Sequence, residues 1–149
     1  MGKFTLAFLG FLISFVVATN VWSKDFGIAY QGAEIEDAVV VVSTVNGMPT
    51  ARLQMTLTNT AIDKITIVGV RSTLHDGSTI FAQISPEKVS RIETVSVLSE
   101  EKLSMKEAGI FIQLDNLQNP VPVSEKREFR LILINGEMPF KAHITTPTH

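Results

Sequence analysis

The side chains able to bind a metal ion are few in this chain. There are three histidines, five methionines and no cysteine, which excludes disulfides, thiol redox chemistry and thiolate metal sites. His75 stands in a turn signal, where a solvated polar side chain is the simpler interpretation. The last strand and the tail carry two histidines that can chelate a borderline metal only weakly. The candidate metal ligands are His75, Met105, Met138, His143 and His149.

Residues suited to catalysis form no recognisable constellation. No serine lies in a Gly-x-Ser-x-Gly motif, and phosphate-cradling glycine loops are absent. The acidic pairs Glu34/Glu36 and Glu100/Glu101 are most simply solvated strand and turn residues, and no glycosidase pair can be argued from them. We therefore predict that the protein is not an enzyme.

Two short segments share a Phe-x-Gln pattern, with Phe81 and Gln83 in one and Phe111 and Gln113 in the other. Read with the period of two that strands have, all four side chains point outward, while the aliphatic residues between them point inward. Two interpretations stay open. The phenylalanines stack across neighbouring strands and cover each other, which is the simpler one, or they form an exposed aromatic patch that docks a partner.

The first 23 residues have the pattern of a secretory signal peptide. A short basic segment, Met1-Gly-Lys3, precedes an apolar run over residues 4–18, and Val21 and Ser23 occupy the positions that signal peptidase prefers. The apolar run is shorter than the roughly 20 residues that span a membrane. We predict a signal peptide over residues 1–23 and one domain over residues 24–149. An exported domain without disulfides fits the bacterial periplasm.

The charge of the mature chain argues against nucleic acid as a partner. Cleavage before Lys24 leaves 12 Lys and Arg against 15 Asp and Glu, which is a formal charge of −3. A weakly acidic domain with scattered basic residues lacks the clustered positive charge that binds a phosphate backbone.

The strand signals are local and clear. Residues 51–58 alternate between apolar and polar side chains, with Ala51, Leu53, Met55 and Leu57 inward. Asn46-Gly47 predicts a turn, and Asn135-Gly136 between two apolar runs predicts a hairpin with a type I′ turn. Residues 99–107 are ambiguous, and we expect a strand or irregular structure there. Seven to nine short strands and no helix after the signal peptide predict an all-β, antiparallel β-sandwich.

In its order of segments the chain resembles the periplasmic copper chaperones called PCu(A)C, which have a cupredoxin-like β-sandwich. Ile35-Glu-Asp-Ala38 is similar to the family's Ile-x-Asp-Ala opening, and Ile67-Val-Gly-Val70 to its Leu-Val-Gly-Ala segment. Met55-Thr-Leu-Thr-Asn59 is similar to the end of its Tyr-Leu-Thr-Leu-Thr-Asn strand, and Ala108-Gly-Ile-Phe-Ile-Gln-Leu114 to its Gly-Gly-Leu-His-Leu-Met-Leu strand. The likeness runs over residues 33–144.

The family binds copper through an open site of two histidines and two methionines. The resemblance puts the histidines at Phe81 and Phe111, one methionine at Gln113 and the other near Ile92, and Gln83 repeats the Met-to-Gln change on the earlier strand. None of these side chains holds soft Cu(I), because Phe and Ile have no lone pair and an amide oxygen is a hard ligand. The resemblance therefore implies a copper site that has lost its ligands.

Together, the residues and the resemblance predict a periplasmic, non-enzymatic binding or accessory protein without a cofactor. Its site is the surface of Phe81, Gln83, Ile92, Phe111 and Gln113. The predicted partner is a protein in the periplasm or exposed on the inner membrane, or a second copy in a homodimer. The alternative is a copper-binding metallochaperone that uses the histidines and methionines named above as surrogate ligands.

Overall fold

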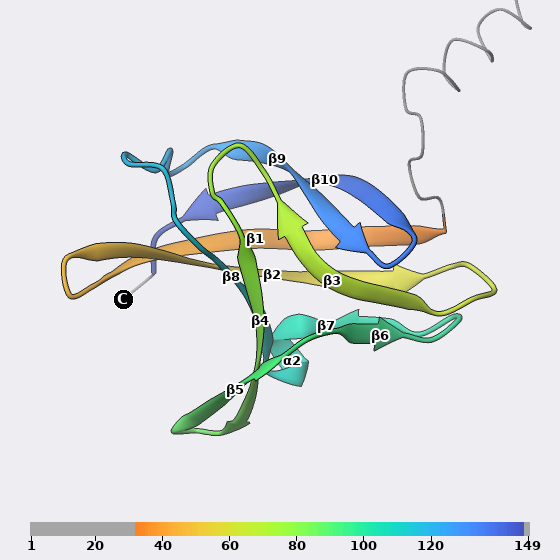
Figure 1. The fold of residues 1–149 in the computed structure, drawn as a ribbon. Coiled ribbons are helices and arrows are strands. Elements are labelled where there is room, and N and C mark those ends of the chain that lie inside the picture. The colour runs from red at the N-terminus through yellow and green to blue at the C-terminus, as the bar shows by residue number, and fades with distance from the viewer. Residues whose placement is uncertain (1–31, 148–149) are drawn as a thin grey trace, which may run out of the picture.

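Ten strands form one sheet in the computed structural model of the chain, which describes residues 32–147 (Figure 1). The strands and the short helix are β1 (Ala33–Val45), β2 (Met48–Asn59), β3 (Ile65–Arg71), β4 (Ser78–Ser85), β5 (Lys88–Ile92), β6 (Val95–Val97), β7 (Lys102–Ser104), α2 (Met105–Ala108), β8 (Ile110–Leu114), β9 (Lys126–Leu133) and β10 (Gly136–Thr145). Their order is β5-β4-β8-β2-β1-β10-β9-β3-β6, with β7 paired to β2. The predicted signal peptide, residues 24–31 and His149 lie outside the described residues.

Strand β2 lies near the middle of the sheet and follows its predicted alternation. Its four inward side chains, Ala51, Leu53, Met55 and Leu57, are buried, whereas Arg52 between them is exposed. Burying an aliphatic side chain of this size stabilises the fold by about 1.5–3 kcal/mol. The alternation therefore fixes which face of β2 meets the core.

The sheet bends over itself so that its inner faces enclose one core (Figure 1). The largest buried side chains of that core are Phe129, Leu53, Leu57, Ile65, Ile67, Met105, Ile112, Leu131 and Ile144. The predicted all-β class is confirmed. One pairing departs from an antiparallel sheet, because β1 and β10 run parallel, with Val39 beside His143.

Both predicted Asn-Gly turns connect neighbouring strands, but their geometries differ. Asn46 and Gly47 link β1 to β2 with φ values of 53° and 78°, as a type I′ turn requires. The β9–β10 hairpin is confirmed, with Gly136 paired to Leu133, yet neither Asn135 nor Gly136 has a positive φ. The type I′ geometry predicted there is wrong, because β10 already begins at Gly136 and the turn lies one residue earlier.

The ambiguous residues 99–107 contain both a strand and a helical turn. Strand β7 is followed directly by α2, which begins at the N-cap Ser104 and ends at Gly109 with φ 70°. Met105 of α2 is fully buried, so the turn is held by packing as well as by its caps. The strand expectation holds for β7, and the helix was not predicted.

No helix within residues 32–147 has the length and apolar character needed to cross a membrane.

Candidate functional site

Phe81 on β4 and Phe111 on β8 face each other across two hydrogen-bonded strands. They are direct partners in the ladder, their ring centroids are 5.4 Å apart, and their ring planes are inclined by 23°. Stacked aromatic pairs contribute about 0.5–1.5 kcal/mol beyond the area that they bury. The stacking that the simpler interpretation predicts is therefore present.

Phe111 has a second cover from β2. The guanidinium carbon of Arg52 lies over the ring, 4.3 Å from its centroid, a distance suited to a cation–π contact. Only 6% of Phe111 is exposed, although it lies outside the main core cluster. The exposed patch of the second interpretation does not include Phe111, because Phe81 and Arg52 enclose it, while Phe81 itself stays partly exposed.

The two glutamines share the outward face of these strands, but each bonds within its own segment. Gln83 donates from Nε2 to the carbonyls of Ser85 at 2.9 Å and Pro86 at 3.2 Å. Gln113 donates from Nε2 to Oδ1 of Asp115 at 3.4 Å. The Gln83 amide is therefore committed to the β4–β5 turn, and the Phe pair is the centre of the face.

Ile92 does not lie on this face. It is the direct partner of Ile80, which is in turn the partner of Ile112, and it packs against the main core. Phe81 has Arg91 as its partner on β5 instead. The position expected to complete the site therefore lies on the opposite face of the sheet from the Phe pair.

His75 is buried, which corrects the expectation of a solvated turn residue. Only 8% of it is exposed, and its ring stacks on Phe129 at 6.3 Å. Its Nε2 lies 3.2 Å from the carbonyl of Val70 and its Nδ1 lies 2.6 Å from Oγ of Ser72. Because a carbonyl only accepts, Nε2 carries the proton and Nδ1 accepts from Ser72. Burial lowers the pKa of His75 below 6.5, and neither ring nitrogen is left for a metal.

The other surrogate ligands that the structure describes are not brought together. Met105 is fully buried in the core, and Met138 is partly buried against it. His143 is exposed on the same strand as Met138, but an odd spacing of five residues puts the two on opposite faces, about 17 Å apart. Within residues 32–147, no three His, Asp or Glu side chains form a group able to hold a metal ion.

A hollow of about 920 Å³ that the sequence did not indicate lies beside this face. Strand β1 has a bulge between Glu36 and Val39 there. The pairing of β2 changes from β8 to β7 at the same level, and Gln54 bridges the gap by donating from Nε2 to the Ile110 carbonyl at 3.0 Å. Its lining is charged with both signs and consists of Glu36, Asp37, Val39, Val41, Gln54, Met55, Thr56, Lys102, Ser104, Lys106 and Glu107.

Arg52 is the residue of the Phe face that sequence reasoning missed. The alternation of β2 places it outward, and the structure confirms that it is exposed. What the sequence lacks is a signal that β2 and β8 are neighbours, because residues so far apart in the chain meet only through the strand order. Without that order, Arg52 cannot be assigned to the Phe111 ring.

Comparisons with known proteins find the same fold among solved structures. No protein-family model and no curated protein match the sequence. Among solved structures, the copper-bound PCuAC domain from PmoF2 is 20% identical, with a TM-score of 0.66 over 80% of this chain and 97% of that domain. The apo PCuAC domain from PmoF1 is 16% identical, with a TM-score of 0.63 over 79% and 98%.

A third similar structure is CuI-DR1885 from Deinococcus radiodurans, which is 18% identical, with a TM-score of 0.57 over 77% of this chain and 80% of that one. These identities are low, and the likeness is one of architecture over most of the described residues. The chain therefore has the fold of the PCuAC domains.

Proposed function

We propose that this chain is a non-enzymatic periplasmic accessory protein that uses the outer face of β4, β8 and β2 to bind a protein partner and holds no copper there. One observation carries the proposal. Phe81 and Phe111 stack on each other at the two positions where the resemblance to PCu(A)C puts histidine ligands. A benzene ring offers Cu(I) no lone pair.

Two further features support binding of a partner. The face keeps a partly exposed ring, Phe81, beside an exposed arginine, Arg52, and aromatic and arginine side chains are enriched at protein interfaces. The surrogate copper ligands that the structure describes lie apart, and His75 has both ring nitrogens occupied. Within residues 32–147, the metallochaperone alternative therefore has no assembled set of ligands to support it.

The copper half of the proposal is tested by titrating residues 24–149 with Cu(I) against a colorimetric chelator. We expect no competition from the natural chain. The triple variant Phe81→His, Phe111→His and Gln113→Met should take up about one Cu(I) per chain, because it restores imidazole and thioether ligands on adjoining strands. Thr66→His with Ser96→His controls for any histidine pair, because these two residues are direct partners on β3 and β6, with Ser96 exposed and Thr66 half-buried.

Tight stoichiometric binding by the natural chain would contradict the loss of the copper site. A folded triple variant that binds no better than the control pair would show that these positions are not those of the family's ligands.

The partner half is tested by immobilising the chain and capturing proteins from a periplasmic extract. We expect Phe81→Ser to abolish capture, because Phe81 is the part of the stack that solvent reaches. Ile134→Ser, which changes an apolar side chain 70% exposed in the β9–β10 turn, is the matched control. Loss of capture in both variants, or in neither, would contradict a docking role for this face.

A further inference from the structure

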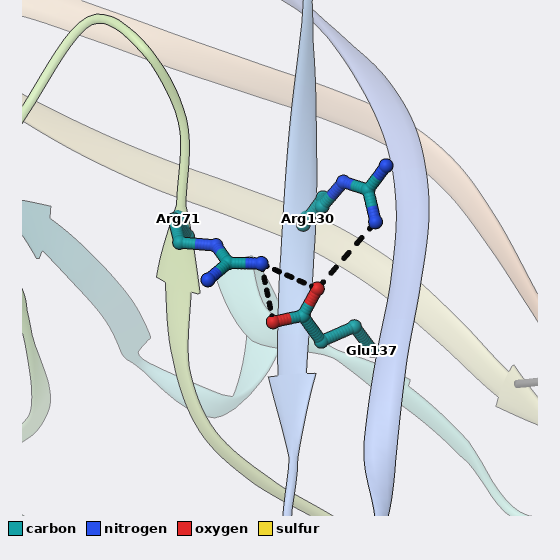
Figure 2. Close-up of polar contacts among 3 residues, drawn as sticks. All are labelled: Arg71, Arg130 and Glu137. Atoms are coloured by element: carbon teal, nitrogen blue, oxygen red, sulfur yellow. Dashed lines mark hydrogen bonds and ion pairs between the residues drawn. The ribbon is translucent and has the colours of Figure 1, made fainter. Parts of the chain in front are cut away.

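The ion pairs of the arginines divide them into two groups. Arg71 and Arg130 share Glu137, with Arg71 Nη2 at 2.6 Å from Oε1 and Arg130 Nη1 at 3.5 Å from Oε2 (Figure 2). Arg127 pairs through Nε with Glu125 at 2.8 Å. These three arginines line an open hollow of about 540 Å³ with Glu128, so their charges are balanced by carboxylates around them.

Arg52 and Arg91 are the two arginines within residues 32–147 that have no carboxylate oxygen within 4.0 Å. Both are exposed, and both lie at the Phe pair. Arg91 is the ladder partner of Phe81, and Phe81 is the partner of Phe111. Arg52 covers Phe111. Arg52 itself is the ladder partner of Gln113 and reaches over Phe111 with its guanidinium. The arginines without an ion pair among the described residues therefore flank the Phe pair, one from β5 and one from β2.

The packing of Arg52 suits it to a carboxylate ligand. A guanidinium is planar and carries five N–H donors, and it is weakly hydrated, so it stacks on a ring and still binds a carboxylate through two parallel hydrogen bonds at its rim. Asp115, an acid that directly follows β8, is engaged by Thr79 Oγ1 at 3.0 Å and Gln113 Nε2 at 3.4 Å. The donors of Arg52 thus remain available to a ligand from outside.

We propose that the row Arg52–Phe111–Phe81–Arg91 binds an acidic, extended segment of a partner protein that crosses the strands. This inference rests on the proposed function and names the chemistry of its partner. The strands of Arg52 and Arg91 are three steps apart, which is about 14 Å at the usual spacing of strands. Arg52 is offset by two residues from Phe111 along the strands, and its side chain spans that offset because the guanidinium lies over the Phe111 ring. Acidic residues four positions apart on an extended chain are about 13 Å apart on one face, with an apolar residue midway. The segment therefore has the pattern acidic-x-apolar-x-acidic, its apolar side chain resting on Phe81.

The probe is a fluorescein-labelled peptide containing Glu-Ser-Leu-Ser-Glu, and its matched control contains Gln-Ser-Leu-Ser-Gln. Fluorescence anisotropy should show that the natural chain binds the acidic peptide at least about ten-fold more tightly than the amide peptide, because charge-assisted bonds are lost in the control. Arg52→Gln and Arg91→Gln should each weaken binding of the acidic peptide by about ten-fold or more. Arg71→Gln, which removes an ion-paired arginine, should leave it unchanged, and thermal melts should show all variants folded.

Each result either supports or overturns the proposal. Equal binding of both peptides, no binding of either, or an equal loss in Arg71→Gln overturns it. If Phe81→Ser abolishes partner capture but Arg52→Gln and Arg91→Gln do not, the face still docks a partner and only the acidic chemistry is wrong. If analytical ultracentrifugation shows a dimer that Arg52→Gln dissociates, the face binds a second copy of the chain, and the proposed partner is overturned. Tight Cu(I) binding by the natural chain overturns the proposed function itself.

Discussion

A phenylalanine and a histidine at one position of a strand make opposite demands on their surroundings. An imidazole lone pair needs a metal or a hydrogen-bond donor, whereas a benzene ring needs only to be covered. At Phe111 that cover comes from Phe81 and Arg52. The same place on the sheet therefore offers apolar area and a cation, and it offers no ligand atoms. This is the residue-level basis for proposing a protein partner in place of copper.

His75 gives the chain a stability that depends on pH. Its pKa is lowered below 6.5 chiefly by burial, against the opposing effects of the Val70 carbonyl and of Asp115 and Asp76. The unfolded chain therefore takes up a proton before the native chain does, and the free energy of unfolding falls as pH drops below about 6.5. We expect urea unfolding between about pH 7.5 and pH 5.5 to show this loss.

The loss should be smaller in His75→Gln, which removes the titrating group. His143→Gln, at an exposed position on β10, should keep the pH dependence of the natural chain. An unchanged pH dependence in His75→Gln would mean that burial of this ring is not the source of the effect.

At the scale of elements, Gly109 connects α2 to β8 and also contacts β4. Gly109 has φ 70°, and its carbonyl accepts a hydrogen bond from the backbone N–H of Gln83 at 2.7 Å. An added Cβ would lie 3.2 Å from Cβ of Gln83. We expect Gly109→Ala to lower the free energy of unfolding by more than the roughly 1 kcal/mol that the left-handed conformation alone costs. Urea denaturation measures it.

Gly47 offers the matched control. It has φ 78°, but an added Cβ would meet nothing within 4 Å, so Gly47→Ala isolates the backbone cost. Equal losses of unfolding free energy in the two variants would mean that the close contact with Gln83 adds no cost at Gly109.

The elements that the sequence predicts well are those whose signal is local. The alternation of β2, the turn at Asn46-Gly47 and the existence of the β9–β10 hairpin fall into this class, because their signals lie in adjacent residues. The type of turn in the β9–β10 hairpin was not predicted correctly. Helix α2 was missed although its signal was present, since Ser104 with Glu107 and then Gly109 is a capping pattern. A four-residue helix has too few periodic positions to stand out from a strand.

At the scale of the whole molecule, prediction was limited by contacts between distant segments. His75 reads as a turn residue, and only its packing on Phe129 buries it. Phe111 reads as outward, which is correct, but its cover by Arg52 follows from the order β8-β2. The alternation of residues along β5 does not by itself say which face of the sheet Ile92 lies on. Its pairing with Ile80 shows that it points inward. Likeness in segment order therefore predicted the fold more fully than the site.

The parallel pairing of β1 with β10 also governs how the chain reaches its native state. Val39 and His143 are neighbours in the sheet but come from opposite ends of the domain. Loop closure over so long a chain is entropically costly, and contacts at high sequence separation slow folding. Strand β1 can pair with β2 as soon as the Asn46-Gly47 turn forms, but its other edge has no partner until β10 is present. A domain connected in this way stays incomplete until its last strand has been synthesised, so a chain that ends before β10 leaves one edge of β1 without its partner.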